Sequence, residues 1–166
     1  MVKGLGLLLL ILATTAYGIY KSMCLARRVR LLDGMARLCA YVSSQIRYSG
    51  APVSEILSKA ASCEEFRSLP CLDKIPGSDC WRDAWLDGLA GGVSDWGATD
   101  KDIELIREFS QVLGTTDVEG QVEHCSMYRD MFTHQRDDAK ELSARKGKLY
   151  IILGLSVGSA VALLLF

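Results

Sequence analysis

Two apolar stretches without a charged residue, 4–20 and 149–166, bracket the chain, and every acidic residue lies between them. A helix needs roughly 20 apolar residues to cross about 30 Å of hydrocarbon, so stretches of about 17 or 18 are at the short end of the usable range. A buried helix of a soluble domain is the alternative, but such a helix rarely lacks charge over its whole length. The pattern therefore predicts one transmembrane helix at each end.

The segment between them, residues 21–148, carries apolar side chains at helical steps of three and four, and no alternation typical of strands competes with them. We therefore predict an all-α fold, in which a membrane-anchored bundle of about five to six helices has one transmembrane helix at each end. Residues 70–79 interrupt the pattern and are expected to form a surface loop. The expected helices cover residues 21–48 in continuity with the first span, 52–60, a weaker piece at 64–69, 80–90, 99–113, and a last helix from near Asp117 into the second span.

Helix-start signals support these limits. Asp79 and Thr99 are expected to cap the helices that follow them, and Thr116 with Glu119 forms an S/T-x-x-E capping box before the last helix. Trp81 and Trp85 stand one turn apart, a spacing more typical of core anchors than of a binding platform.

Cations flank the inner side of both predicted spans, which favours a cytosolic position for residues 21–148 because Lys and Arg near a span's ends are retained in the cytoplasm. A competing interpretation makes residues 5–13 the apolar part of a secretory signal that starts at Lys3, with cleavage near residues 13–16. The cations that follow the first span oppose that export. They are Lys21, Arg27, Arg28 and Arg30, and those before the second span are Lys140, Arg145, Lys146 and Lys148.

Residues 21–148 are 128 residues long, enough for one domain, and hold 18 Lys plus Arg against 20 Asp plus Glu. No basic stripe marks a nucleic-acid reader, so we expect no nucleic-acid partner. An acidic patch at Asp137, Asp138 and Glu141 is best explained by pairing with neighbouring cations on the helix surface.

The six cysteines form no C-x-x-C pair, and the two histidines, His124 and His134, do not complete a zinc spacing. We expect His124 to be a helix-surface residue beside the core residue Cys125. In a reducing cytosol the cysteines are expected to be small buried apolar residues, with oxidation of the 63, 71 and 80 group as the alternative if the topology is wrong. A phosphate-binding loop and a Ser, His and acid trio are also lacking. We expect no enzymatic activity and no cofactor.

Small residues recur every four positions in the second apolar stretch, at Gly154, Gly158 and Ala162, and Thr14 and Gly18 offer a matching pair in the first. Such faces let helix backbones approach closely in lipid. We expect the spans to pack through them, against each other or against a second copy in a homo-oligomer.

The most specific segment is 109–121, together with 46–57 and Trp85. It resembles the stage III sporulation protein AB family of endospore-forming bacteria, whose pattern is an apolar and aromatic helix end followed by Leu-Gly-x-Ser/Thr-Asp and Gly-Gln. The length and the two end spans fit as well, whereas the cysteines and the loop at 70–79 depart from the pattern. The matching residues are Phe109, Leu113, Gly114, Thr116, Asp117, Gly120 and Gln121.

The resemblance implies a cytosolic helical domain similar to the F-type platform proteins of type II secretion. It implies a non-enzymatic membrane platform in the mother-cell membrane around the forespore, beside a secretion-type ATPase of the same operon and other membrane proteins of the complex. One alternative is a pore or transporter subunit, although the apolar stretches carry no ionisable residue. Another is a metal- or redox-dependent enzyme built on the cysteines, which metal analysis would reveal.

Overall fold

A computed structural model describes the backbone of residues 2–90 and 96–165, and the side chains of these residues except 2–11, 151, 153–155 and 157–165. Within those ranges every regular element is helical, so the all-α prediction is confirmed. In chain order the elements are α1 (Val2–Ser49), α2 (Val53–Ser62), a 3₁₀ turn (Glu64–Phe66), α3 (Trp81–Ala90), α4 (Asp100–Val112) and α5 (Val118–Leu165).

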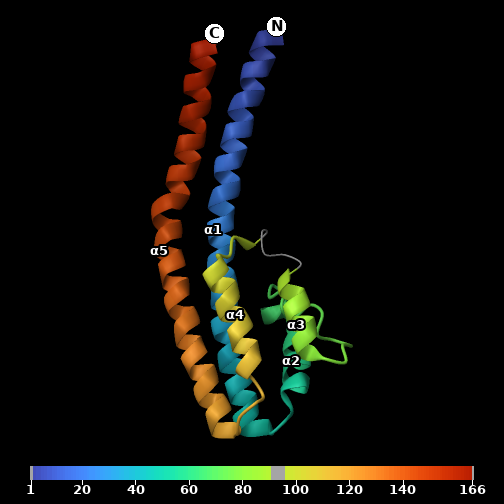
Figure 1. The fold of residues 1–166 in the computed structure, drawn as a ribbon. Helices are drawn as coiled ribbons and strands as arrows, with labels where there is room; N and C mark the ends of the chain where they lie inside the picture. Colours follow the sequence, from blue (N-terminus) through green and yellow to red (C-terminus); the bar gives the residue numbers. More distant parts are fainter. Residues whose placement is uncertain (1, 91–95, 166) are drawn as a thin grey trace.

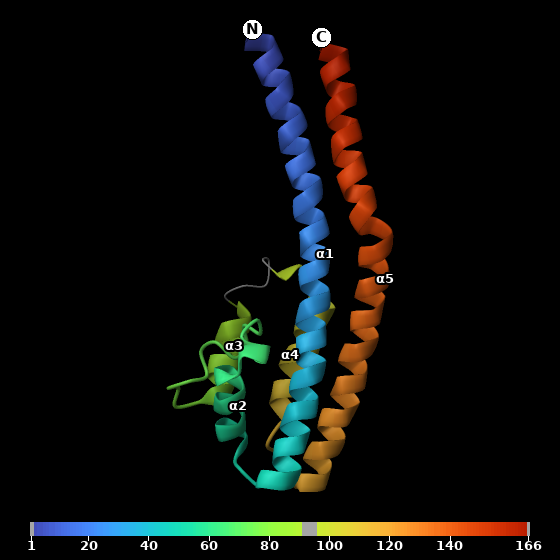
Figure 2. The same ribbon diagram turned by 180° about the vertical axis from the view of Figure 1, so that it is seen from behind.

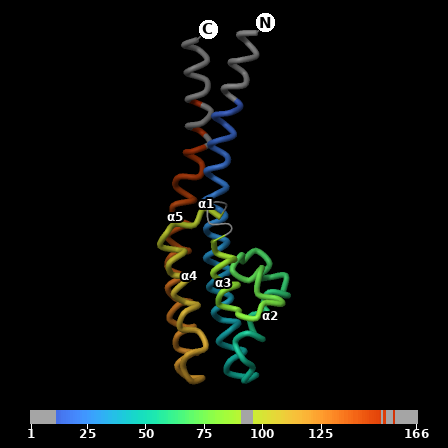
Figure 3. The backbone as a smooth tube through the Cα atoms, turned by 45° about the vertical axis from the view of Figure 1, so that its right-hand side comes forward, coloured from blue at the N-terminus to red at the C-terminus, as the bar shows by residue number. Residues whose placement is uncertain are grey.

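The long helices α1 and α5 form an antiparallel pair that runs the whole length of the molecule (Figure 1). Both termini lie at one end, and the α1–α2 and α4–α5 connections lie together at the other (Figures 1 and 2). The shorter helices pack beside the pair only in the half away from the termini (Figure 3). The predicted continuity of each domain helix with its apolar end is confirmed.

The core lies between α1, α5 and the short helices, and it begins at Leu31 in α1. Leu25 and Val29, apolar residues at helical spacing before it, are only half-buried. Trp85 and Phe109 are fully buried at the centre, with ring centroids 6.0 Å apart. Trp85 is therefore the predicted core anchor, whereas Trp81 is half-buried.

The connection between α2 and α3 corrects three predictions. The piece expected at 64–69 is only a 3₁₀ turn, and α3 starts at Trp81, so that Cys80 rather than Asp79 directly precedes it. The loop at 70–79 is only partly on the surface, since Pro70, Cys71, Leu72 and Ile75 are buried and its other residues are exposed. The burial of Pro70 follows from the close approach of α3, since a Cβ at Gly88 would lie 2.3 Å from the carbonyl oxygen of Pro70.

No helix carries a stretch long and apolar enough to cross a membrane among the residues that the structure describes. Much of both expected spans, 4–20 and 149–166, lies outside the residues with described side chains. Gly154, Gly158 and Ala162 are among those outside, so the packing expected of them stays a prediction.

Candidate functional site

The turn between α4 and α5 holds most of the residues of the 109–121 motif. Leu113 is fully buried and closes α4, and Gly114 follows with a φ of 82°, a left-handed conformation that side chains other than glycine rarely adopt. The reversal at Gly114 brings α5 back along α4. Leu113 and Gly114 thus set the geometry of this turn.

Asp117 starts α5, and this corrects the predicted capping box of Thr116 and Glu119. The helix begins at Val118, one residue later than the box requires, and Oδ1 of Asp117 accepts a hydrogen bond from the backbone N–H of Gly120 at 3.1 Å. The side-chain amide of Gln121 donates to the carbonyl of Thr116 at 2.8 Å. A Cβ at Gly120 would lie 2.8 Å from that Asp117 oxygen, so the motif's Asp, Gly and Gln build one helix start.

Arg82 of α3 caps the opposite side of the same turn, and sequence reasoning missed it. Its Nη2 donates to the carbonyl of Leu113 at 2.7 Å and its Nε to that of Ser110 at 3.4 Å, at the C-terminal end of α4, whose carbonyls have no partner within the helix. The guanidinium also lies over the ring of Trp81, 4.7 Å from its centroid. Local sequence could not predict this cap, because Arg82 lies 31 positions before Leu113 and reaches it only through the packing of α3.

The α1–α2 turn lies against the α4–α5 turn. In the α1–α2 turn, Gly50 reverses the chain with a φ of 61°, and Pro52 precedes α2. The two turns are in close contact, since a Cβ built at Gly114 would lie 3.3 Å from Cγ2 of Val53. The two segments that carry the resemblance, 46–57 and 109–121, therefore meet at the end of the molecule opposite the termini. They share a groove of about 360 Å³ there, which we call the distal groove; it is lined by Ile46, Gly50, Ala51, Pro52, Val53, Ser54, Trp81, Arg82, Gly114, Val118 and Gln121.

Phe109, the aromatic residue of the motif, lies beneath the distal groove and not on its surface. Its ring stacks on His124 with centroids 5.5 Å apart and planes inclined by 3°, and Nε2 of His124 lies 3.2 Å from the Phe109 carbonyl oxygen. Tyr128 and Phe132 of α5 pack around it. His124 is thus buried in an aromatic cluster, whereas the sequence suggested a residue on the helix surface.

A buried ion pair joins the other end of α4 to α1. Nε of Arg28 donates to Oδ2 of Asp102 at 2.7 Å, and Nη2 donates to Oδ1 at 3.0 Å. Asp102 also takes part in the predicted helix cap at Thr99, because its carboxylate accepts a hydrogen bond from the backbone N–H of Thr99 at 2.8 Å. Burial alone would raise the pKa of the Asp102 carboxyl, but the hydrogen bonds from Arg28 and Thr99 outweigh it and hold that pKa below its usual range.

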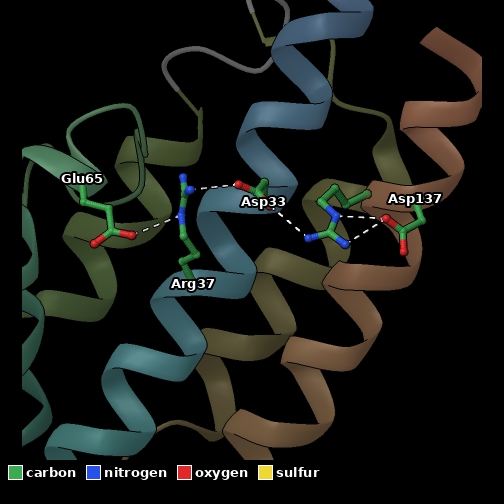
Figure 4. A network of polar contacts seen from close by, with 5 residues as sticks. Asp33, Arg37, Glu65 and Asp137 are labelled. Carbon is green, nitrogen blue, oxygen red and sulfur yellow. Dashed lines mark hydrogen bonds and ion pairs between the residues drawn. The ribbon is translucent and has the colours of Figure 1, made fainter. Parts of the chain in front are cut away.

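A second charge network ties α1 to α5 on the surface (Figure 4). Asp33 accepts from Arg37 and from Arg136, both at 3.0 Å, and Arg136 also binds Asp137. In the acidic patch expected on α5, Glu141 pairs with the Arg four positions after it and Asp137 pairs with Arg136, so the predicted pairing with neighbouring cations is confirmed for these two. Asp138 instead lies 3.9 Å from Nδ1 of His134.

All six cysteines are free thiols. Cys39, Cys71 and Cys125 are buried as expected, and burial raises the pKa of each, that of Cys125 to about 12. Cys80, in contrast, is exposed. Among the described residues, no group of three or more His, Cys, Asp or Glu side chains is placed to hold a metal ion.

Comparison with known proteins agrees with the motif. The family profile described as stage III sporulation protein AB matches residues 3–166. A curated protein of that name from Bacillus subtilis (strain 168) is 24% identical over 172 residues, which cover 99% of each chain. No solved structure matches the chain.

Proposed function

Because the chain belongs to the stage III sporulation protein AB family, we propose that it is a non-enzymatic membrane platform of a sporulation-specific, secretion-like complex between mother cell and forespore. In this proposal the apolar ends of α1 and α5 anchor the protein in the mother-cell membrane around the forespore. The helical half between them faces the cytosol and binds a secretion-type ATPase. Other membrane proteins of the complex are its neighbours in the bilayer.

One observation carries the proposal: the two motif segments, far apart in the sequence, meet in the distal groove at the end farthest from the apolar termini. If the termini lie in a membrane, the distal groove is the part of the protein that extends deepest into the cytosol. Val118 lines this groove and is 51% exposed, and Val112 is a further exposed apolar residue at the adjoining end of α4. Exposed apolar groups beside an Arg are typical of the centre of a protein interface.

Purification of the tagged full-length chain from sporulating cells tests this. We expect a secretion-type ATPase to come with the parent and to be lost with Val118→Asp, which places a charge in the distal groove. Leu86→Asp is the matched control, since Leu86 is 40% exposed on α3 and lies outside the groove. Absence of the ATPase from the parent preparation would refute the docking role, and equal loss with both variants would refute the assignment of the groove.

A further inference from the structure

A second groove, about 290 Å³ in volume, lies on the face of the α1–α5 pair. It is not part of the proposed ATPase contact. Most of its lining side chains are small, being Cys, Ala or Ser, and two cations also line it, Arg47 on α1 and Arg129 on α5. We call it the lateral groove. It is lined by Cys39, Ala40, Ser43, Ser44, Arg47, Tyr48, Val122, Cys125, Ser126 and Arg129.

A different face of α5 presents a ridge that fits this groove. Met127 and Met131 lie one turn apart on α5 and are 50% and 44% exposed, whereas another face of the same helix is buried. Met127 is five positions after Val122, and Met131 is five positions after Ser126. At 3.6 residues per turn, each methionine therefore points about 140° away around the helix axis from a residue of the lateral groove. Exposed methionines are adaptable contact residues, and Glu123 and Asp130 flank these two. We call these four residues the methionine ridge.

We propose that the methionine ridge of one copy of this chain packs into the lateral groove of the next copy. This inference rests on the proposed membrane anchoring, because copies related by an axis along the membrane normal keep the same depth. The ridge covers residues 123–131 of α5 and the groove covers 122–129, so the two surfaces lie at equal depth without any adjustment.

The charges of the two surfaces are complementary at that register. Arg47 lines the groove together with Val122, at the level of Glu123 on the incoming ridge. Arg129 of the groove lies at the level of Asp130 on the incoming copy. Within one chain, Arg129 and Asp130 form an ion pair at 3.3 Å in which both side chains are exposed. The small Cys, Ala and Ser side chains that line the groove leave room for the methionines, as in ridge-into-groove helix packing.

Since ridge and groove are different surfaces of one chain, the contact is heterologous and builds a ring or a row. The ridge spans only about two and a half turns of helix, so the contact is smaller than a standard interface, which buries roughly 1,600 Å². We therefore expect association to depend on confinement to one membrane, where the effective concentration is high.

A benzophenone amino acid in place of Met127, in the full-length chain in its native membranes, tests the contact. We expect a photo-adduct of twice the chain mass, in which the peptide joined to the probe-bearing peptide contains residues 39–48 of the second copy. The same probe at Leu86 is the matched control and should give no such adduct.

Charge reversal then tests the register. Arg47→Glu should lower the adduct yield at least about tenfold, because it sets two like charges against each other. Adding Glu123→Arg to that variant should restore the yield. Carbonate extraction of the same membranes separates this inference from the proposal it rests on: a chain that stays in the membrane without a dimer adduct at Met127, or with an adduct to another protein, overturns only the self-contact. A chain that carbonate releases overturns the anchoring as well.

Discussion

Neutralising Asp102 should destabilise the fold far more than neutralising a surface carboxylate with as many partners. Asp102→Asn keeps the size of the side chain but leaves Arg28 with no opposite charge in a site where Asp102 is 0% exposed. Removing one partner of a buried ion pair costs about 3–5 kcal/mol, because the other charge remains buried and uncompensated. At about 2–4 °C per kcal/mol for a chain of this size, the thermal midpoint should fall by roughly 10 °C.

Asp33→Asn is the matched control. Asp33 also accepts from two guanidinium groups at 3.0 Å, but its side chain is 33% exposed and both of its partners reach solvent. Surface ion pairs contribute about 0–1 kcal/mol, so this variant should shift the midpoint by no more than a few degrees. Thermal unfolding of the full-length chain in detergent, followed by far-ultraviolet circular dichroism, measures both.

The stability difference between Asp102→Asn and the parent should also depend on pH. The folded-state pKa of Asp102 lies below the unfolded value of about 3.9, so the stabilisation is complete above that value and is lost as pH falls through the folded-state pKa. The variant lacks this titration. The gap should therefore be constant near neutral pH and narrow in acid, and an Asp102→Asn effect no larger than that of Asp33→Asn would refute the reasoning.

Three further outcomes are expected. Asp117→Ala removes the acceptor that starts α5 and should cost about 1 kcal/mol in thermal unfolding, whereas an unchanged midpoint with lost ATPase binding would place Asp117 in the contact surface. Gly88→Ala should destabilise by about 1–3 kcal/mol, because its new methyl would meet the Pro70 carbonyl, and a crystal structure without displacement there would contradict this. A membrane-impermeant maleimide should label Cys80 only after permeabilisation, while buried Cys71 stays unlabelled; labelling of Cys80 in intact cells would reverse the proposed topology.

The motif residues illustrate how far local sequence reaches. The position of the α4–α5 junction followed from Gly114 and from the helix-start signals, since a glycine with positive φ and a capping carboxylate act within a few residues. The residue predicted to cap α5 was wrong by one position, because the hydroxyl of Thr116 and the carboxylate of Asp117 are both competent caps and the packing of α5 selects between them. The burial of Asp102 gives no local signal, because it depends on Arg28, 74 positions away.

The sequence by itself determined the all-α class, the order of the helices, the continuity of α1 and α5 with the apolar ends, and the family, because helical periodicity, caps and motifs are local. The tertiary structure alone decided which side chains from distant segments meet: Arg82 on the end of α4, Arg28 on Asp102, and the two motif turns in one distal groove. These contacts depend on the relative placement of whole helices, which follows from the packing of the complete core.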